Sequence, residues 1–136
     1  MSAEVTYDYV VVRVVPRVER GERINAGVIL SCVDSEILQC RLELDDARLR
    51  ALDPDVDLDA IRAGLALIAR VCAGGADAGP IGELPARGRF RWLASPRSTM
   101  IQTSPVHTGR TCDPEAALTR LFDTMVRSTP AADSSL

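Results

Sequence analysis

The chain has 136 residues, of which 46% are hydrophobic and 26% charged, and its formal net charge is -3. This balance fits a single soluble globular domain with an aliphatic core, since aromatic residues make up only 4%. The net acidity argues against nucleic-acid binding, which needs a basic surface, and because all sixteen basic residues are arginine, mechanisms that need a lysine amine are excluded.

Strands are predicted first along the chain. The segment Thr6–Val15 is apolar at the centre of both faces, which is typical of an interior strand buried on two sides. A charged connection, Arg17–Arg23, turns at Gly21 and leads to a second strand, Ile24–Val33. The next segment, Glu36–Leu44, alternates apolar and polar residues, which predicts a strand with one wet face. We expect these three strands to form an antiparallel meander.

Helices are predicted in the middle of the chain. Asp45 caps a short helix that ends at Leu52, and Asp57 caps a longer one whose apolar stripe runs to Cys72. The following segment, Ala76–Arg87, is rich in glycine and proline. The glycine-rich run Ala73–Gly82 follows a helix and contains no lysine, whereas a phosphate-binding loop needs Gly-Lys-Ser/Thr at the head of a helix. The run is therefore predicted to be a linker.

The last third of the chain predicts two short strands and a helix. The strands are expected at Arg89–Ala94 and Thr99–Thr103, and the helix begins at Asp113-Pro114-Glu115, a strong start sequence. Residues 128–136 are polar and are predicted to be a disordered tail. The sequence therefore predicts an α+β fold in one domain, residues 1–127, with an antiparallel sheet covered by two or three helices.

The cysteines and the N-terminus indicate where the protein resides and what it can bind. No pair of cysteines has the spacing of metal ligands and there is one histidine, so we expect no metal and no cofactor. The N-terminus lacks the basic start and apolar core of a signal peptide, and no segment is long enough to span a membrane. Reduced thiols without an export signal predict a cytoplasmic protein that does not contact membranes.

The segment 96–109 is the most polar part of the chain that lies between apolar elements. Arginine, hydroxyl groups, an amide and a histidine together are able to hold a phosphate or a carboxylate through charge-assisted hydrogen bonds. The candidate binding residues are Arg97, Ser98, Thr99, Gln102, Ser104 and His107. Strand alternation would divide these side chains between two faces, and Ser104-Pro105 and Thr108-Gly109 are ordinary turn pairs, so a structural strand and turn is the alternative.

A second candidate is the charged connection before the second strand. Its candidate residues are Glu19, Glu22, Arg23 and Asn25. A magnesium site there would need more acids than these, and a solvated turn is the simplest interpretation. Charged turns of this kind also make docking surfaces for a protein partner.

Five segments together resemble a known bacterial family, and the resemblance covers the chain from about Tyr7 to Arg127. These segments are Tyr7-Asp8-Tyr9, Arg13-Val14-Val15-Pro16, Glu22–Val28, Arg91-Trp92-Leu93 and Pro96–Gly109. The family is the one known as domain of unknown function 3037, which has no assigned activity. Its members are often encoded beside a kinase resembling HipA, so the resemblance implies a partner or regulator of such a kinase.

Two functions are compatible with these patterns. The first is a non-catalytic binding module that docks on a protein partner, a HipA-like kinase in the version that the resemblance implies. The alternative is a small phosphoryl-transfer or hydrolytic enzyme that uses His107 and Arg97, which requires an acid such as Glu19 or Glu22 to fold against the imidazole. An exposed sheet edge would also permit pairing with a second copy of the chain.

Overall fold

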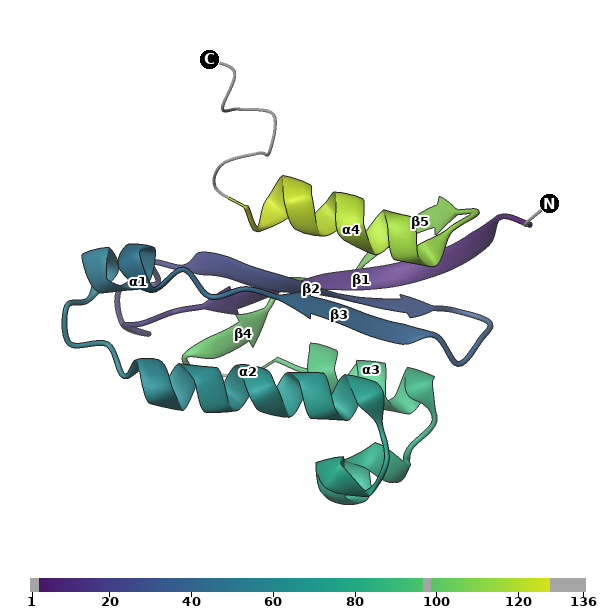
Figure 1. The fold of residues 1–136 in the computed structure, drawn as a ribbon, viewed down its shortest axis with the longest axis horizontal. Coiled ribbons are helices and arrows are strands. Elements are labelled where there is room, and N and C mark those ends of the chain that lie inside the picture. The colour runs from purple at the N-terminus through teal and green to yellow at the C-terminus, as the bar shows by residue number, and fades with distance from the viewer. Residues whose placement is uncertain (1–2, 97–98, 128–136) are drawn as a thin grey trace, which may run out of the picture.

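The fold is an antiparallel sheet of five strands with helices on both faces (Figure 1). It was obtained as a computed structural model, which describes residues 3–96 and 99–127. The predicted tail, 128–136, and the candidate residues Arg97 and Ser98 lie outside the described residues. The α+β prediction is confirmed, and so is the N-terminal meander of three strands.

Along the described chain the elements begin with three strands, continue with helices, and end with two short strands and a helix. They are β1 (Val5–Val14), β2 (Ile24–Cys32), β3 (Leu38–Leu42), α1 (Asp46–Leu52), α2 (Leu58–Ala73), the 3-10 helix η1 (Ala76–Glu83), α3 (Ala86–Ala94), β4 (Ile101–Thr103), β5 (His107–Thr111) and α4 (Pro114–Met125). Three helices begin as predicted, because the side chains of Asp45, Asp57 and Asp113 accept hydrogen bonds from backbone N–H groups in the first turns of α1, α2 and α4.

The sheet has the order β3-β2-β1-β4, and β5 also pairs with β1. The register of β1 and β2 shifts between Val12 and Arg13: Val12 pairs with Gly27 and Arg13 with Asn25, so Ala26 is an extra residue. Such a bulge changes which face the following side chains occupy. In a regular strand, Ile24 and Ala26 would lie on the face opposite Ile29, because each lies an odd number of positions before it. The bulge explains why all three share one core.

Two apolar cores lie on opposite faces of the sheet. Helices α2 and α3 cover one face, where Val10, Val12 and Val14 of β1 are completely buried. Helix α4 covers the other face and packs against Tyr7 of β1 and Leu30 of β2 (Figure 1). Burial of β1 from both sides confirms that it is an interior strand.

Three predictions in the second half of the chain are wrong. Residues 89–94 form part of helix α3 instead of a strand, with Ala86, Phe90 and Leu93 buried at helical spacing. The predicted linker contains η1 and the first two residues of α3. The turn predicted at Thr108-Gly109 is part of strand β5, because both residues pair with β1.

Among the described residues, no helix has the length and apolarity needed to cross a membrane.

Candidate functional site

The polar segment singled out in the sequence forms one edge of the sheet. Strand β4 pairs with Val12–Val14 of β1, and β5 pairs with Val5–Tyr9. Because β2 occupies the opposite side of β1, strands β4 and β5 lie end to end along the same free edge.

Ser104 closes the gap between these two strands. The Val11 N–H donates to Ser104 Oγ at 2.8 Å, and the Ser104 N–H donates to the Val11 carbonyl at 2.9 Å. The Ser104 hydroxyl in turn donates to the carbonyl of Pro105 at 2.9 Å, and its residue is only 3% exposed. A buried hydroxyl with all of these partners holds the edge together and is not free for a ligand.

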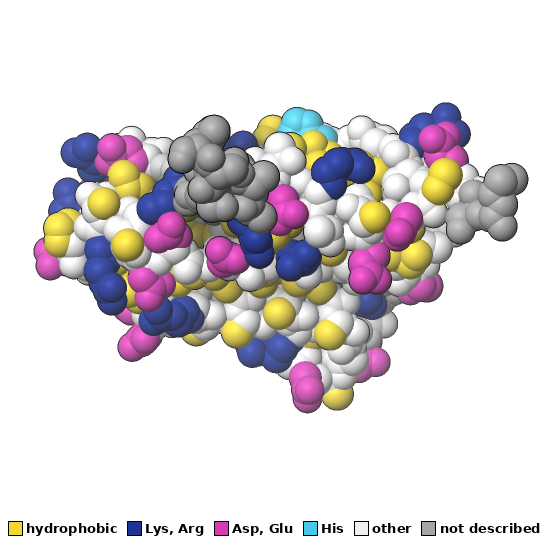
Figure 2. All heavy atoms as spheres, turned by 45° about the horizontal axis from the view of Figure 1, so that its top comes forward, with side chains coloured by type: hydrophobic (Ala, Val, Ile, Leu, Met, Phe, Trp, Pro, Cys, Tyr) yellow, Lys and Arg dark blue, Asp and Glu magenta, His cyan; other side chains and the backbone are white. Residues whose placement is uncertain are grey.

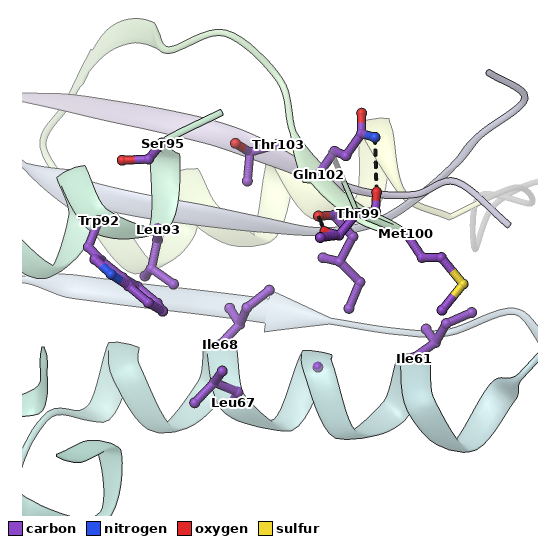
Figure 3. Close-up of a pocket in the computed structure, with 12 residues that line it drawn as sticks. Ile61, Leu67, Ile68, Trp92, Leu93, Ser95, Thr99, Met100, Gln102 and Thr103 are labelled. Atoms are coloured by element: carbon purple, nitrogen blue, oxygen red, sulfur yellow. Dashed lines mark hydrogen bonds between the residues drawn. The ribbon is translucent and has the colours of Figure 1, made fainter. Parts of the chain in front are cut away.

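Below β4, an apolar pocket of about 270 Å³ opens between α2 and α3 (Figure 3). Its lining comes from three elements: Ile61, Gly64, Leu67 and Ile68 of α2, Trp92, Leu93 and Ser95 at the end of α3, and residues 99–103 around β4. At Gly64 a Cβ would lie 2.4 Å from Ile101 Cδ1, so the glycine makes room for the Ile101 side chain. Pockets of this apolar kind are where ligands and partner side chains bind.

The edge of β4 beside the pocket keeps open backbone groups. The Met100 carbonyl accepts from Val15 at 2.7 Å and the Ser104 N–H faces Val11, so alternation turns Ile101 and Thr103 outward. The Thr99 hydroxyl donates to the Ile101 carbonyl at 2.8 Å. Within the described part of the chain, this leaves the Ile101 N–H and both backbone groups of Thr103 available to another strand.

The side chains of His107 and Thr108 lie on opposite faces of the sheet. The Thr108 hydroxyl donates to Asp8 Oδ1 at 2.7 Å, and Asp8 pairs with Arg87 of α3 at 3.0 Å. Arg87 also donates to Ser31 at 3.0 Å, so this network fixes α3 and β5 to the sheet.

His107 is exposed and stacks on Tyr9, with ring centroids 5.3 Å apart (cyan in Figure 2). Among the described residues, the imidazole forms no hydrogen bond or ion pair with a carboxylate. The acids proposed for it, Glu19 and Glu22, precede Ile24, and Ile24 pairs with Val14 of β1. His107 pairs with Tyr9, which lies five residues from Val14 along the same strand. That separation is about 16 Å in an extended strand, so the histidine and the acids are not brought together.

The charged connection before β2 is mostly a surface turn. Arg20 donates to Glu22 at 2.6 Å, and this bond lowers the pKa of the Glu22 carboxyl and raises that of Arg20. Glu19 and Arg23 are exposed. Asn25 instead has a structural contact, since its side-chain N–H donates to the Met125 carbonyl at the end of α4 at 2.9 Å.

Of the remaining candidates, Gln102 donates to the Thr99 carbonyl at 2.9 Å across its own turn. Sequence reasoning missed the pocket, although two residues of α2 point to it. Gly64 is unfavourable inside a helix, and Leu67 lies off the buried stripe and is 38% exposed. No cluster of metal-ligating side chains occurs among the described residues.

Comparisons with known proteins place the chain in a family. Neither the curated proteins nor the solved structures that were compared match it. A family model described as protein of unknown function DUF3037 matches residues 9–126, which is most of the chain. The chain therefore belongs to the DUF3037 family.

Proposed function

We propose that this protein is a non-catalytic binding module of the cytoplasm that docks on a HipA-like kinase through the β4 edge and the pocket beside it. The observation that supports the proposal most is the position of the pocket directly below open backbone groups of β4. A strand of the partner that extends the sheet would direct every second side chain toward this pocket.

The chemistry of the surface supports a binding function more than a catalytic one. The pocket lining is predominantly apolar, and its polar residues are one serine, two threonines and one glutamine. Among the described residues, the imidazole of His107 pairs with no carboxylate, which leaves the enzymatic alternative without the acid that it requires. The kinase as partner follows from the gene neighbourhood that the family resemblance implies.

The direct test is co-purification of the tagged protein with the HipA-like kinase encoded beside it. We expect a complex at about 10 µM of each protein, in the range of transient interfaces. Leu67→Glu should abolish this complex, because it places a charge in the pocket lining where the side chain is already part-exposed. Leu84→Glu is the matched control, since Leu84 is similarly exposed, at 40%, and does not line the pocket.

Two results would contradict the proposal. Absence of a complex with the wild-type chain would refute the kinase as partner. Loss of the complex in Val18→Glu but not in Leu67→Glu would move the docking surface to the charged connection, because Val18 is an exposed residue of that loop.

A further inference from the structure

Three strands bring polar side chains into one row across the sheet. Arg13 of β1 pairs with Asn25 of β2 on one side and with Gln102 of β4 on the other. Directly paired residues of neighbouring antiparallel strands project from the same face. The bond from Asn25 to the Met125 carbonyl identifies this face as the one that α4 covers. Figure 3 agrees, since the Gln102 side chain points away from α2.

The central residue of this row, Arg13, is a cation that forms no ion pair with any described residue. The Arg13 Nε is buried and has no hydrogen-bond partner among the described residues. Burial lowers the pKa of the Arg13 guanidinium, and the nearby charge of Arg23 lowers it further. Within the described chain neither arginine forms an ion pair.

Other arginines on the α4 face have partners. Arg41 donates to Thr119 at 3.1 Å and lies over the Phe122 ring. Arg127 pairs with Asp123, and Arg120 contacts the Tyr7 hydroxyl. Arg13 and Arg23 differ from these. The charge of Arg23 acts on Arg13, and the neighbours of Arg13 on the adjacent strands are the neutral amides Asn25 and Gln102.

An anion would relieve both the repulsion and the unpaired buried donor. A part-buried cation next to a like charge is unfavourable, and a buried donor without a partner calls for an explanation. Two guanidinium groups match the charge of a phosphate monoester and present several N–H donors to its oxygens. We propose that Arg13 and Arg23, flanked by Asn25 and Gln102, form a binding site for a phosphate group. Arg13 and Asn25 do not line the pocket, whereas Gln102 at the sheet edge borders both surfaces. The site does not depend on the proposed function.

Thermal unfolding in the presence of inorganic phosphate tests the site. We expect the unfolding midpoint to rise with phosphate concentration, relative to chloride at equal ionic strength. Phosphate also stabilises proteins generally, so the informative quantity is the difference between variants. Arg23→Gln should weaken the site-specific binding about tenfold or more, as for the loss of a charge-assisted hydrogen bond. Arg23 is exposed, so this variant should fold normally.

Two further variants make the result specific. Arg110→Gln should respond to phosphate like the wild type, because Arg110 pairs with Glu4 near the other end of β1. Gln102→Glu places a carboxylate directly opposite Arg13, so it should raise the midpoint without phosphate and remove the phosphate response.

The source of the phosphate is distinguished by a second probe. Tighter binding of a phosphoserine peptide than of inorganic phosphate would indicate a phosphorylated side chain, and equal binding a small molecule. Either result supports the site. A phosphate response that is identical in the wild type, Arg23→Gln and Gln102→Glu would overturn it.

Discussion

The two faces of the sheet differ most at the end where β4 pairs with β1. On the α2 and α3 face this end is apolar, and Ile101 lies over Gly64 at the pocket. On the α4 face the same end carries Asn25, Arg13 and Gln102 in a row. Alternation along one short strand thus serves two surfaces of opposite character, one suited to an apolar side chain and the other to an anion.

The bulge in β2 contributes to this difference. It lies opposite Val12 and Arg13 and adds Ala26 to one strand. The extra residue places Ile24 and Ala26 in the α2 core while Asn25 projects toward the end of α4. Bulges commonly re-aim side chains next to functional sites, which is consistent with both surfaces lying beside this one.

The largest expected effect is on the ion-pair network of the α2 and α3 face. Asp8→Asn removes the carboxylate that pairs with Arg87 and accepts a hydrogen bond from Thr108. The Asp8 side chain is only 15% exposed and that of Arg87 only 25%. We expect a loss of about 2 kcal/mol in unfolding free energy, measured by urea denaturation. Glu4→Gln breaks the exposed pair with Arg110 and should cost less than about 0.5 kcal/mol. Equal losses in the two variants would show that the network does not hold α3.

The edge between the two surfaces should be nearly as sensitive. Ser104→Ala leaves the buried Val11 N–H without its acceptor, so we expect a loss of about 1–3 kcal/mol. Amide hydrogen exchange at Val11 should accelerate as well. Thr103→Ala is the neighbouring control, with an expected change within about 0.5 kcal/mol. An unchanged exchange rate at Val11 would refute the role of the hydroxyl in closing the edge.

On the α4 face, a smaller effect is expected at Asn25. Asn25→Ala removes the neutral hydrogen bond to the Met125 carbonyl, which should cost about 1 kcal/mol and loosen the last turn of α4. Thermal unfolding and amide exchange of that turn measure both consequences. If α4 keeps its protection in this variant, the row of polar side chains does not anchor the helix.

The smallest effect concerns Glu22, which lies outside both surfaces. The hydrogen bond to Arg20 lowers the pKa of the Glu22 carboxyl in the folded state. The bond therefore stabilises the fold at pH values above the pKa of the unfolded state, and this stabilisation is lost as the pH falls through the pKa of the folded state. Because the pair is fully exposed, the pH dependence should be barely detectable. Side-chain titration by NMR should show a low pKa that returns to the ordinary range in Arg20→Gln. A normal pKa in the wild type would contradict the ion pair.

The elements with strong local patterns were predictable, and those that depend on distant partners were not. Alternation identified β3, and aspartate caps identified α1, α2 and α4. Residues 89–92 alternate arginine with aromatic side chains and so resemble a strand. The helical spacing of the buried residues appears only when Ala86 is included. Strand β5 is polar and contains Gly109, and it is held extended by pairing with Tyr7 and Tyr9 of β1.

The candidate site also has features that the sequence predicts and features that depend on distant partners. Alternation correctly suggests that polar groups of the 96–109 segment lie on two faces, as they do for His107 and Thr108. The sequence contains no indication that Arg13 lies between Asn25 and Gln102, because that row depends on the register of three strands and on a bulge. The pocket likewise depends on how α3 packs beside α2.

The separation of the two surfaces is tested most directly by measuring both kinds of binding in the same pair of variants. Gly64→Ala should displace Ile101 and reduce the pocket without destabilising α2, since alanine favours helix. This variant is expected to lose the HipA-like kinase and keep its response to phosphate, whereas Arg23→Gln should keep the kinase and lose the phosphate response. If either substitution abolished both kinds of binding, the two faces would not act as separate surfaces and the account would be contradicted.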